Sequence, residues 1–158
     1  MKEELIVKKL IEQKETISSM ESCTSGYFAT SITNVSGSSE VLKFSAITYS
    51  NEYKIKFGVK SETIEKYSVY SNEVSREMSK CIHNYTGSTY SVGITGQINR
   101  VDPNNPYGKD NLVYASIYDS KNDKYYDLKI TCPNKERLEC KKYIVDKVMD
   151  EFINILKA

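Results

Sequence analysis

A short run of hydroxyl and thiol side chains near the N-terminus offers the clearest chemistry in this sequence. The segment Glu21-Ser22-Cys23-Thr24-Ser25-Gly26 follows a predicted strand and precedes a predicted helix. The start of a helix presents unpaired backbone N–H groups and a partial positive charge, so such a turn can hold a phosphate group or stabilise an oxyanion. It also places Ser22 where a nucleophile would meet a bound acyl group. Taken alone, the pattern is more often that of a helix cap.

A serine nucleophile needs a base, and the usual partner is histidine. The chain has one histidine, His83, which lies off the apolar stripe of its predicted helix and is therefore expected to be solvated. A Ser-His-Asp or Cys-His arrangement is accordingly not expected, and Cys23 is predicted to be a small buried side chain. Lysine can replace histidine as the base when burial or a neighbouring cation lowers its pKa.

One lysine follows a predicted strand closely enough to reach the same site. In Tyr49-Ser50-Asn51-Glu52-Tyr53-Lys54 the first residue ends the strand, and the residues after it can form one helical turn. Tyr49 and Lys54 could thus both reach the strand ends. On spacing alone a solvated lysine is the more common outcome, because the chain has 22 lysine and arginine residues.

Charge and composition exclude several classes of protein. The 22 basic and 21 acidic residues give a net charge of +1, without long runs of one sign, so no nucleic-acid partner is expected. No apolar stretch approaches the roughly 18 residues of a spanning helix, and the N-terminus does not resemble a signal peptide. A cytoplasmic protein without membrane contact is therefore expected. The four cysteines form no CxxC pair, so free thiols and no metal site are expected.

Hydrophobic periodicity and turn residues predict an alternation of helices and strands. Helices are expected at residues 3–14, 26–33, 61–65, 71–85 and 136–156, with Ser71 capping the fourth. Strands are expected at 16–20, 43–49, 90–95, 112–118 and 125–130, the last two as a hairpin; loops are expected at 35–39 and 97–110. This order indicates one α/β domain over residues 1–158, a three-layer α/β/α sandwich with a mixed, mostly parallel sheet.

Several of these segments together resemble one known family. Residues 21–26 resemble the ESCTGG signature of the CinA C-terminal family, the nicotinamide-nucleotide amidohydrolases, and residues 49–54 resemble its YSNEAK segment. Further similar segments follow in the family's order: Val35-Ser36-Gly37-Ser38-Ser39, Phe57-Gly58-Val59, Tyr70-Ser71-Asn72-Glu73-Val74 and Gly93-Ile94-Thr95-Gly96. The resemblance covers roughly residues 5–156.

The resemblance implies a three-layer α/β/α domain that hydrolyses the carboxamide of nicotinamide mononucleotide to nicotinate mononucleotide and ammonia, without a cofactor. Carried over by motif, Ser22 is the nucleophile, Lys54 is the general base, and Tyr49 assists proton transfer or orients the lysine. Substrate contacts are expected from residues of the matching segments: Thr24, Ser25, Gly26, Ser38, Ser39, Asn51, Thr95, Gly96 and Arg137. The implied partner is a small-molecule nucleotide, and a homo-oligomer is expected.

Three segments depart from the family pattern. Ser25 stands in place of the first glycine of the family's pair, where a positive φ would favour glycine. In the loop 97–110, which would line the substrate site, residues 97–106 lack the glycines that the family has there and carry new polar groups. Arg137 and Lys141 preserve one arginine and a lysine of a GDRxxVR segment, although a solvated helix face explains them equally well. The sequence therefore leaves two alternatives: a divergent homologue that binds a nucleotide as a regulatory module without this activity, and an amidohydrolase for another small amide.

Overall fold

A five-stranded sheet forms the centre of the computed structural model, which describes residues 1–99 and 110–157. Its strands run in the order β2-β1-β3-β4-β5, and their bounds are β1 (Ile17–Glu21), β2 (Ala46–Ile47), β3 (Tyr90–Gly96), β4 (Leu112–Asp119) and β5 (Lys124–Thr131). β1 is parallel to β2 and β3, whereas β3–β4 and β4–β5 are antiparallel. The prediction of a mostly parallel sheet is therefore wrong. The short connection from β4 to β5 permits only antiparallel pairing, because a parallel pair needs a long crossover.

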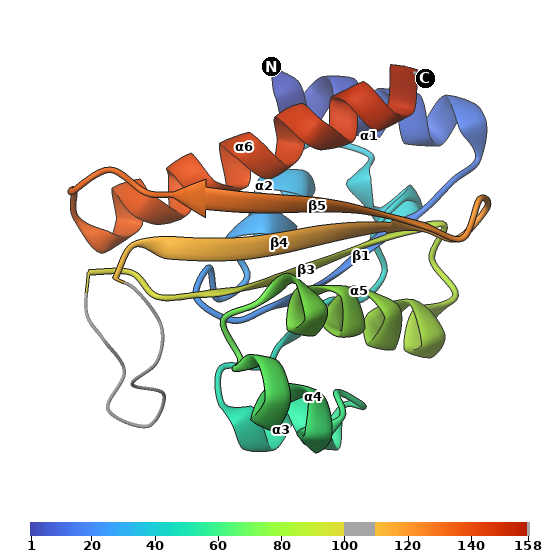
Figure 1. The fold of residues 1–158 in the computed structure, drawn as a ribbon. Coiled ribbons are helices and arrows are strands. Elements are labelled where there is room, and N and C mark those ends of the chain that lie inside the picture. Colours follow the sequence, from blue (N-terminus) through green and yellow to red (C-terminus); the bar gives the residue numbers. More distant parts are fainter. Residues whose placement is uncertain (100–109, 158) are drawn as a thin grey trace.

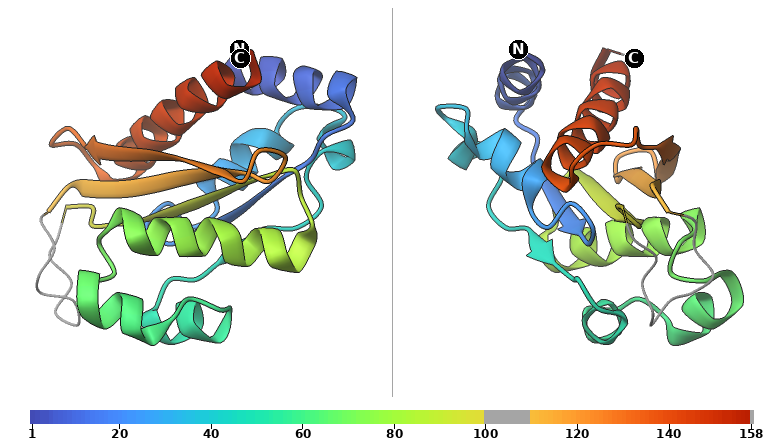
Figure 2. Two further views of the ribbon diagram at one scale, coloured as in Figure 1. Left: turned by 45° about the vertical axis from the view of Figure 1, so that its right-hand side comes forward. Right: turned by 90° about the vertical axis from the view of Figure 1, so that its left-hand side faces the viewer.

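Helices cover both faces of the sheet, as Figures 1 and 2 show. One face carries α1 (Lys2–Gln13), α2 (Tyr27–Thr33) and α6 (Arg137–Lys157), and the other side carries α3 (Asn51–Lys56), α4 (Ser61–Tyr67) and α5 (Asn72–Thr86). A short 3-10 helix, η1 (Ser38–Glu40), follows α2. The predicted three-layer α/β/α arrangement is confirmed. No helix within the described residues is long and apolar enough to span a membrane.

The sheet divides the apolar core into two parts. The larger part lies against α1, α2 and α6 and includes Leu10, Phe28 and Phe152, each fully buried. The smaller part lies under α5. There Gly93 of β3 allows a close approach, because an added Cβ would lie 2.2 Å from the carbonyl oxygen of Ser75. This contact holds α5 close to the middle of β3.

The strand predicted over residues 43–49 is regular only over the two residues of β2. Before it, the Ser45 side chain takes the place of a main-chain partner: its Oγ accepts hydrogen bonds from the N–H (3.1 Å) and the Oγ (2.9 Å) of Ser19. Beyond it, the Thr48 N–H donates to the Glu21 carbonyl at 2.9 Å. The segment thus follows β1 up to its last residue, which sets where α3 begins.

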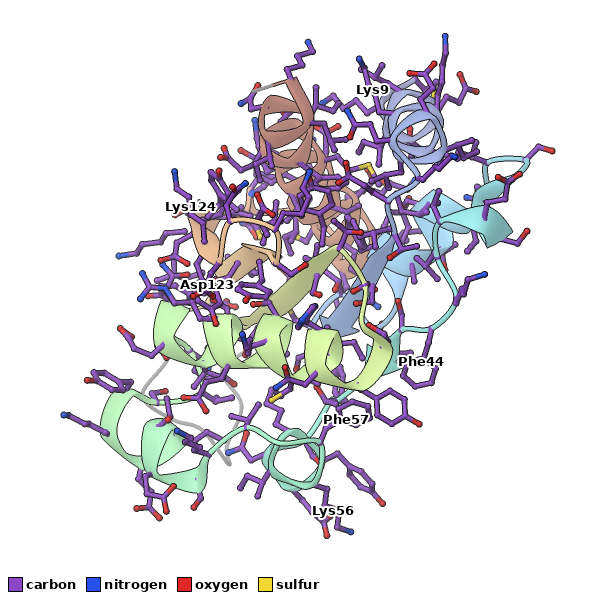
Figure 3. All side chains as sticks on the ribbon, turned by 90° about the vertical axis from the view of Figure 1, so that its right-hand side faces the viewer. Lys9, Phe44, Lys56, Phe57, Asp123 and Lys124 are labelled. Carbon is purple, nitrogen blue, oxygen red and sulfur yellow. The ribbon has the colours of Figure 1, made fainter. Side chains whose placement is uncertain are left out.

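An exposed aromatic cluster anchors the far end of α3. Phe44 and Phe57, labelled in Figure 3, stack with ring centroids 6.4 Å apart. Tyr85, near the end of α5, packs against both rings at 5.1 and 5.3 Å. Because Phe57 is the residue directly after α3, this cluster holds the short helix against α5.

Candidate active site

Ser22 and Lys54 meet at the carboxyl end of β1. Ser22 Oγ accepts a hydrogen bond from Lys54 Nζ at 2.9 Å, and Lys54 Nζ also donates to the Thr48 carbonyl oxygen at 2.8 Å. Both side chains are buried, with 7% of Ser22 and 2% of Lys54 exposed. The structure therefore brings together the two residues that the sequence predicted as nucleophile and base.

The start of α3 determines where the Lys54 side chain lies. Ser50 is the N-cap of this helix, and its Oγ accepts a hydrogen bond from the Tyr53 N–H at 3.2 Å. The cap and the Thr48–Glu21 hydrogen bond place the first turn of α3 beside the end of β1. Lys54 Nζ is thus held within hydrogen-bond reach of the Ser22 hydroxyl, which is the geometry that a general base requires.

Glu21, which the sequence analysis did not single out by itself, holds the turn that carries Ser22. Its carboxylate is fully buried. It accepts four hydrogen bonds, from the Oγ1 of Thr24 (2.7 Å), the Oγ of Ser19 (2.9 Å) and the N–H groups of Phe28 (2.9 Å) and Ala29 (3.1 Å). The N-cap residue of α2 is Gly26, which has no side chain, so Glu21 satisfies the first donors of this helix instead. The signal in the sequence was a carboxylate directly before a strand-to-helix turn with glycine at the cap.

This arrangement decides which groups of the turn can face a ligand. The N–H groups of Phe28 and Ala29 and the Thr24 hydroxyl donate to Glu21, and the Tyr27 N–H donates to the Thr24 carbonyl oxygen, so these groups are not available to a substrate. The backbone N–H groups of Thr24 and Gly26 have no hydrogen-bond acceptor among residues 1–99 and 110–157. Because both lie within four residues of Ser22, they are candidate donors to an oxyanion.

Two alternative catalytic groups are excluded by their surroundings. Burial raises the pKa of the Cys23 thiol to about 12, so this neighbour of Ser22 stays protonated at neutral pH. His83 lies at the opposite edge of the sheet, where its Nδ1 contacts the Ser88 carbonyl oxygen at 2.7 Å. His83 thus lies at the amino end of β1, about 13 Å from the carboxyl end of this five-residue strand at 3.3 Å per residue. Contrary to the prediction, His83 is half-buried rather than solvated, because its ring packs edge-on against Tyr118.

The first two turns of α6 carry two cations toward the site. Lys141 Nζ donates a hydrogen bond to Ser25 Oγ at 2.8 Å. Arg137 donates to the Ile98 carbonyl oxygen and, at 3.3 Å, to the Tyr49 hydroxyl. Tyr49 is 61% exposed. The structure thus pairs Tyr49 with Arg137, and the predicted part of Tyr49 in proton transfer stays a prediction.

The backbone of the turn has the conformation that the resemblance implied for a glycine pair. Ser25 has φ 44° and Gly26 has φ 94°. The left-handed region is therefore occupied by a serine followed by a glycine. A serine in this conformation is strained by roughly 1 kcal/mol relative to glycine.

The remaining predicted contacts lie in different places. Ser38 and Ser39 are in η1, beyond the C-terminal end of α2, whereas Ser22 precedes its N-terminal end. Ser38 Oγ donates to the Thr33 carbonyl oxygen at 3.4 Å, which is a structural role. The structure does not bring these two serines to Ser22, so their contact with a substrate stays a prediction.

The other three predicted contacts lie nearer the carboxyl ends of the strands. Thr95 Oγ1 is buried and donates to the Val69 carbonyl oxygen at 3.0 Å, and Gly96 lies against β4, where an added Cβ would be 2.6 Å from Val113 Cα. Asn51 is the first residue of α3. Most of the predicted loop 97–110 lies outside the described residues. Within residues 1–99 and 110–157 no group of three or more metal-ligating side chains occurs.

Comparison with known proteins gives one family. Residues 1–156 match the family model described as CinA C-terminal domain. A CinA-like protein of Kosmotoga olearia is 40% identical over 119 residues, which are 73% of this chain and 28% of that protein. A CinA-like protein of Endomicrobium trichonymphae is 35% identical over 130 residues, 80% of this chain and 30% of that protein. The chain thus spans less than a third of the length of these curated relatives.

Solved structures with the same fold include the competence/damage inducible protein CihA from Agrobacterium tumefaciens. Its TM-score is 0.84 at 22% identity, with 100% of this chain and 97% of that chain covered. A competence or damage-inducible protein from Enterobacter asburiae has a TM-score of 0.88 at 18% identity, with 98% and 96% covered. At these identities the likeness shows the fold alone, and the family follows from the model match over residues 1–156. The chain belongs to the CinA C-terminal domain family.

Proposed function

We propose that this protein hydrolyses the carboxamide of nicotinamide mononucleotide to nicotinate mononucleotide and ammonia, with Ser22 as nucleophile and Lys54 as general base. The observation that carries the proposal is the 2.9 Å hydrogen bond between Lys54 Nζ and Ser22 Oγ, in a place where both side chains are buried. A lysine amine at this distance can take the proton of the attacking serine hydroxyl. The choice of substrate rests on family membership and on the resemblance of the two segments that carry the pair.

In the first half of the reaction the carboxamide is exchanged for an ester. Lys54 takes the hydroxyl proton while Ser22 Oγ attacks the carboxamide carbon and forms a new C–O bond. The oxygen of the tetrahedral intermediate becomes negative, and the N–H groups of Thr24 and Gly26 are available to stabilise it. When the C–N bond breaks, Lys54 returns the proton to the nitrogen, which leaves as ammonia.

In the second half, water removes the acyl group. Lys54 takes a proton from a water molecule as its oxygen attacks the ester carbon. The bond between that carbon and Ser22 Oγ then breaks, and the serine regains its proton from Lys54. The released product is nicotinate mononucleotide, and each cycle consumes one amide and one water.

Ammonia release from nicotinamide mononucleotide by the purified chain tests this proposal. We expect activity in the wild type and a loss of at least about 1,000-fold in Ser22→Ala, because the covalent intermediate can no longer form. Mass spectrometry of acid-quenched wild type should detect the acyl-enzyme on the peptide containing Ser22. Ser91→Ala, which alters a buried serine at the opposite edge of the sheet, is the matched control and should keep full activity.

Two results would favour the alternatives. If wild type and Ser22→Ala are equally inactive while the nucleotide raises the melting temperature of both, the chain is a nucleotide-binding regulatory module. If the wild type releases ammonia from another small amide and not from the mononucleotide, it is an amidohydrolase of different specificity. A cytoplasmic location and a homo-oligomer remain part of the proposal, to be checked by cell fractionation and by light scattering.

A further inference from the structure

The side of the site that faces α6 carries positive charge that no carboxylate of the described residues neutralises. Neither Arg137 nor Lys141 forms an ion pair within residues 1–99 and 110–157. The nearby carboxylate, that of Glu21, is buried and accepts four hydrogen bonds from the turn and from α2. A negatively charged group of a ligand would supply the missing counter-charge.

Other charged side chains of α6 do have partners within the described residues, including Lys147, whose Nζ lies over the Tyr143 ring. Lys142, one residue further on, pairs with Glu139 at 3.4 Å. Asp146 and Asp150 both pair with Lys2 of α1, at 2.7 and 2.8 Å. Cations in the first turns of a helix are also opposed by the helix dipole. The two unpaired cations therefore occupy positions that are unfavourable for stability and favourable for binding an anion.

A phosphate group at this site would have to be recognised largely by side chains. The usual backbone site for phosphate is the set of N–H groups at a helix N-terminus. In α2 the N–H groups of Phe28 and Ala29 already donate to Glu21. Binding of a phosphate near this turn therefore depends on the cations that reach it from α6.

Of the two cations, Lys141 has the greater free capacity. Arg137 is already bonded to the Ile98 carbonyl oxygen and the Tyr49 hydroxyl. Lys141 donates one hydrogen bond to Ser25, and an ammonium group has three N–H donors. Ser25 adopts a φ of 44°, where glycine would be less strained. A serine kept in a strained conformation, with its hydroxyl on Lys141, indicates that the hydroxyl has a use.

We infer that Lys141, positioned by Ser25, binds the phosphate group of the substrate and so makes the enzyme select a phosphorylated amide over its unphosphorylated counterpart. The inference rests on the proposed function for the identity of the substrate. Its structural basis, an unpaired lysine held at the turn after the nucleophile, does not depend on the reaction.

Steady-state kinetics with two substrates test the inference. For Lys141→Ala we expect the KM for nicotinamide mononucleotide to rise about 10- to 100-fold with kcat changed less than about threefold, because a charge-assisted hydrogen bond is lost away from the reacting atoms. The weak activity toward the dephosphorylated riboside should not change, so the preference for phosphate disappears. Lys142→Ala, one residue further along the same helix and exposed, is the matched control and should behave as wild type.

Ser25→Gly tests the positioning role separately. Glycine keeps the left-handed backbone and removes only the hydroxyl, so the fold should be retained. We expect the KM for the mononucleotide to rise about 3- to 10-fold, with kcat and the riboside activity unchanged. A KM equal to that of the wild type would show that Ser25 does not position Lys141.

Binding measured without turnover separates this inference from the proposed function. Inorganic phosphate and the mononucleotide should each raise the melting temperature of wild type and Lys142→Ala, and at the same concentration they should raise that of Lys141→Ala much less. If the wild type shows these shifts and no hydrolysis, the phosphate site stands and the proposed reaction is wrong. If Lys141→Ala keeps both the wild-type KM and the wild-type shifts, the phosphate site is wrong, whatever the reaction.

Discussion

Two clusters that contain buried hydroxyl groups lie at opposite ends of the parallel strands β1 and β3. Each includes a nitrogen base, His83 at the amino ends and Lys54 at the carboxyl ends. At the amino ends of β1 and β3, four hydroxyl side chains bond to one another, and His83 lies beside them. The four are those of Ser18, Thr86, Ser88 and Ser91. Ser18 Oγ lies 2.6 Å from Ser88 Oγ, which lies 3.1 Å from Ser91 Oγ, and Thr86 bonds to two of them. His83 contacts the Ser88 carbonyl oxygen. In this cluster the polar groups satisfy one another.

At the carboxyl ends the same kinds of residue are arranged differently. Ser22 faces Lys54, while the N–H groups of Thr24 and Gly26 and the cation of Lys141 keep hydrogen-bonding capacity that no described residue uses. A self-satisfied polar cluster stabilises a fold, whereas a site that acts on a ligand must hold unsatisfied groups in place. A serine beside a nitrogen base therefore indicates an active site only where donors that no other group uses lie next to it.

The largest effect, on activity, should come from separating Ser22 from Lys54 at the carboxyl end of β1. Lys54→Met removes the amine while nearly keeping the side-chain volume. We expect kcat/KM for nicotinamide mononucleotide to fall about 1,000-fold or more, because the proton of Ser22 loses its acceptor. The melting temperature should change little, since a buried amine is replaced by an apolar group. Ammonia release and a thermal melt measure both, and full activity in this variant would eliminate Lys54 as the base.

The next largest effect, on stability, should come from removing the Glu21 carboxylate, which accepts the hydrogen bonds of the turn after β1. Glu21→Ala leaves two buried N–H groups of α2 without a partner, and we expect the free energy of unfolding to fall by about 3 kcal/mol or more. Glu21→Gln keeps one acceptor oxygen and should lose less. Urea denaturation measures both variants. Equal stability of Glu21→Ala and wild type would show that α2 does not depend on this carboxylate.

Substitutions in the hydroxyl cluster at the amino ends of β1 and β3 should have a moderate effect on stability and none on activity. Ser88→Ala removes the central hydroxyl of the self-satisfied cluster, and we expect a loss of about 1–2 kcal/mol in the free energy of unfolding. His83→Ala should likewise leave kcat/KM unchanged, because its ring is on the other edge of the sheet. A decrease of more than about tenfold in kcat/KM for either variant, measured well below the melting temperature, would contradict the division between the two clusters.

The smallest effect concerns Cys23, the inert neighbour of Ser22. Its pKa is raised by burial from 9.0 to about 12, so the folded state holds the proton more tightly than the unfolded state. The resulting stability is complete below about pH 9 and is lost as the pH rises toward 12. At pH 10 the stability lost relative to neutral pH amounts to about 1 kcal/mol. Cys23→Ala should therefore lose less stability than wild type between pH 7 and pH 10, and its activity at pH 7 should stay within about threefold.

Much of the fold was predictable because the signals were local. Ser71 caps α5, as expected, and its Oγ accepts a hydrogen bond from the Val74 N–H at 3.2 Å. The hairpin β4–β5 was correctly predicted from two β-rich runs separated by turn residues. The proximity of Ser22 and Lys54 was also anticipated, since each follows the end of a predicted strand.

The features that were missed depend on contacts between distant segments. Lys141 lies 116 positions from Ser25, and neither residue type signals the other in the sequence. In the sequence Glu21 is only the first residue of the 21–26 segment. Its role as hydrogen-bond acceptor for α2 becomes visible only in the structure. The mixed character of the sheet was predicted correctly, but the extent of antiparallel pairing was not. It depends on which side of β3 receives the hairpin, and that choice is made by packing rather than by the residues of the strands.

The parallel pairing of β1 with β3 has a consequence for protein synthesis. Tyr90 of β3 pairs with Ile17, and the β1–β3 ladder lies between the two helical layers. When the ribosome has made the segment that contains both Ser22 and Lys54, β1 has its neighbour β2 but still lacks β3, and contacts so distant in sequence form slowly. The α6 cations Arg137 and Lys141 are translated later still. A nascent or prematurely terminated chain should therefore carry the complete dyad in its sequence and have no hydrolytic activity.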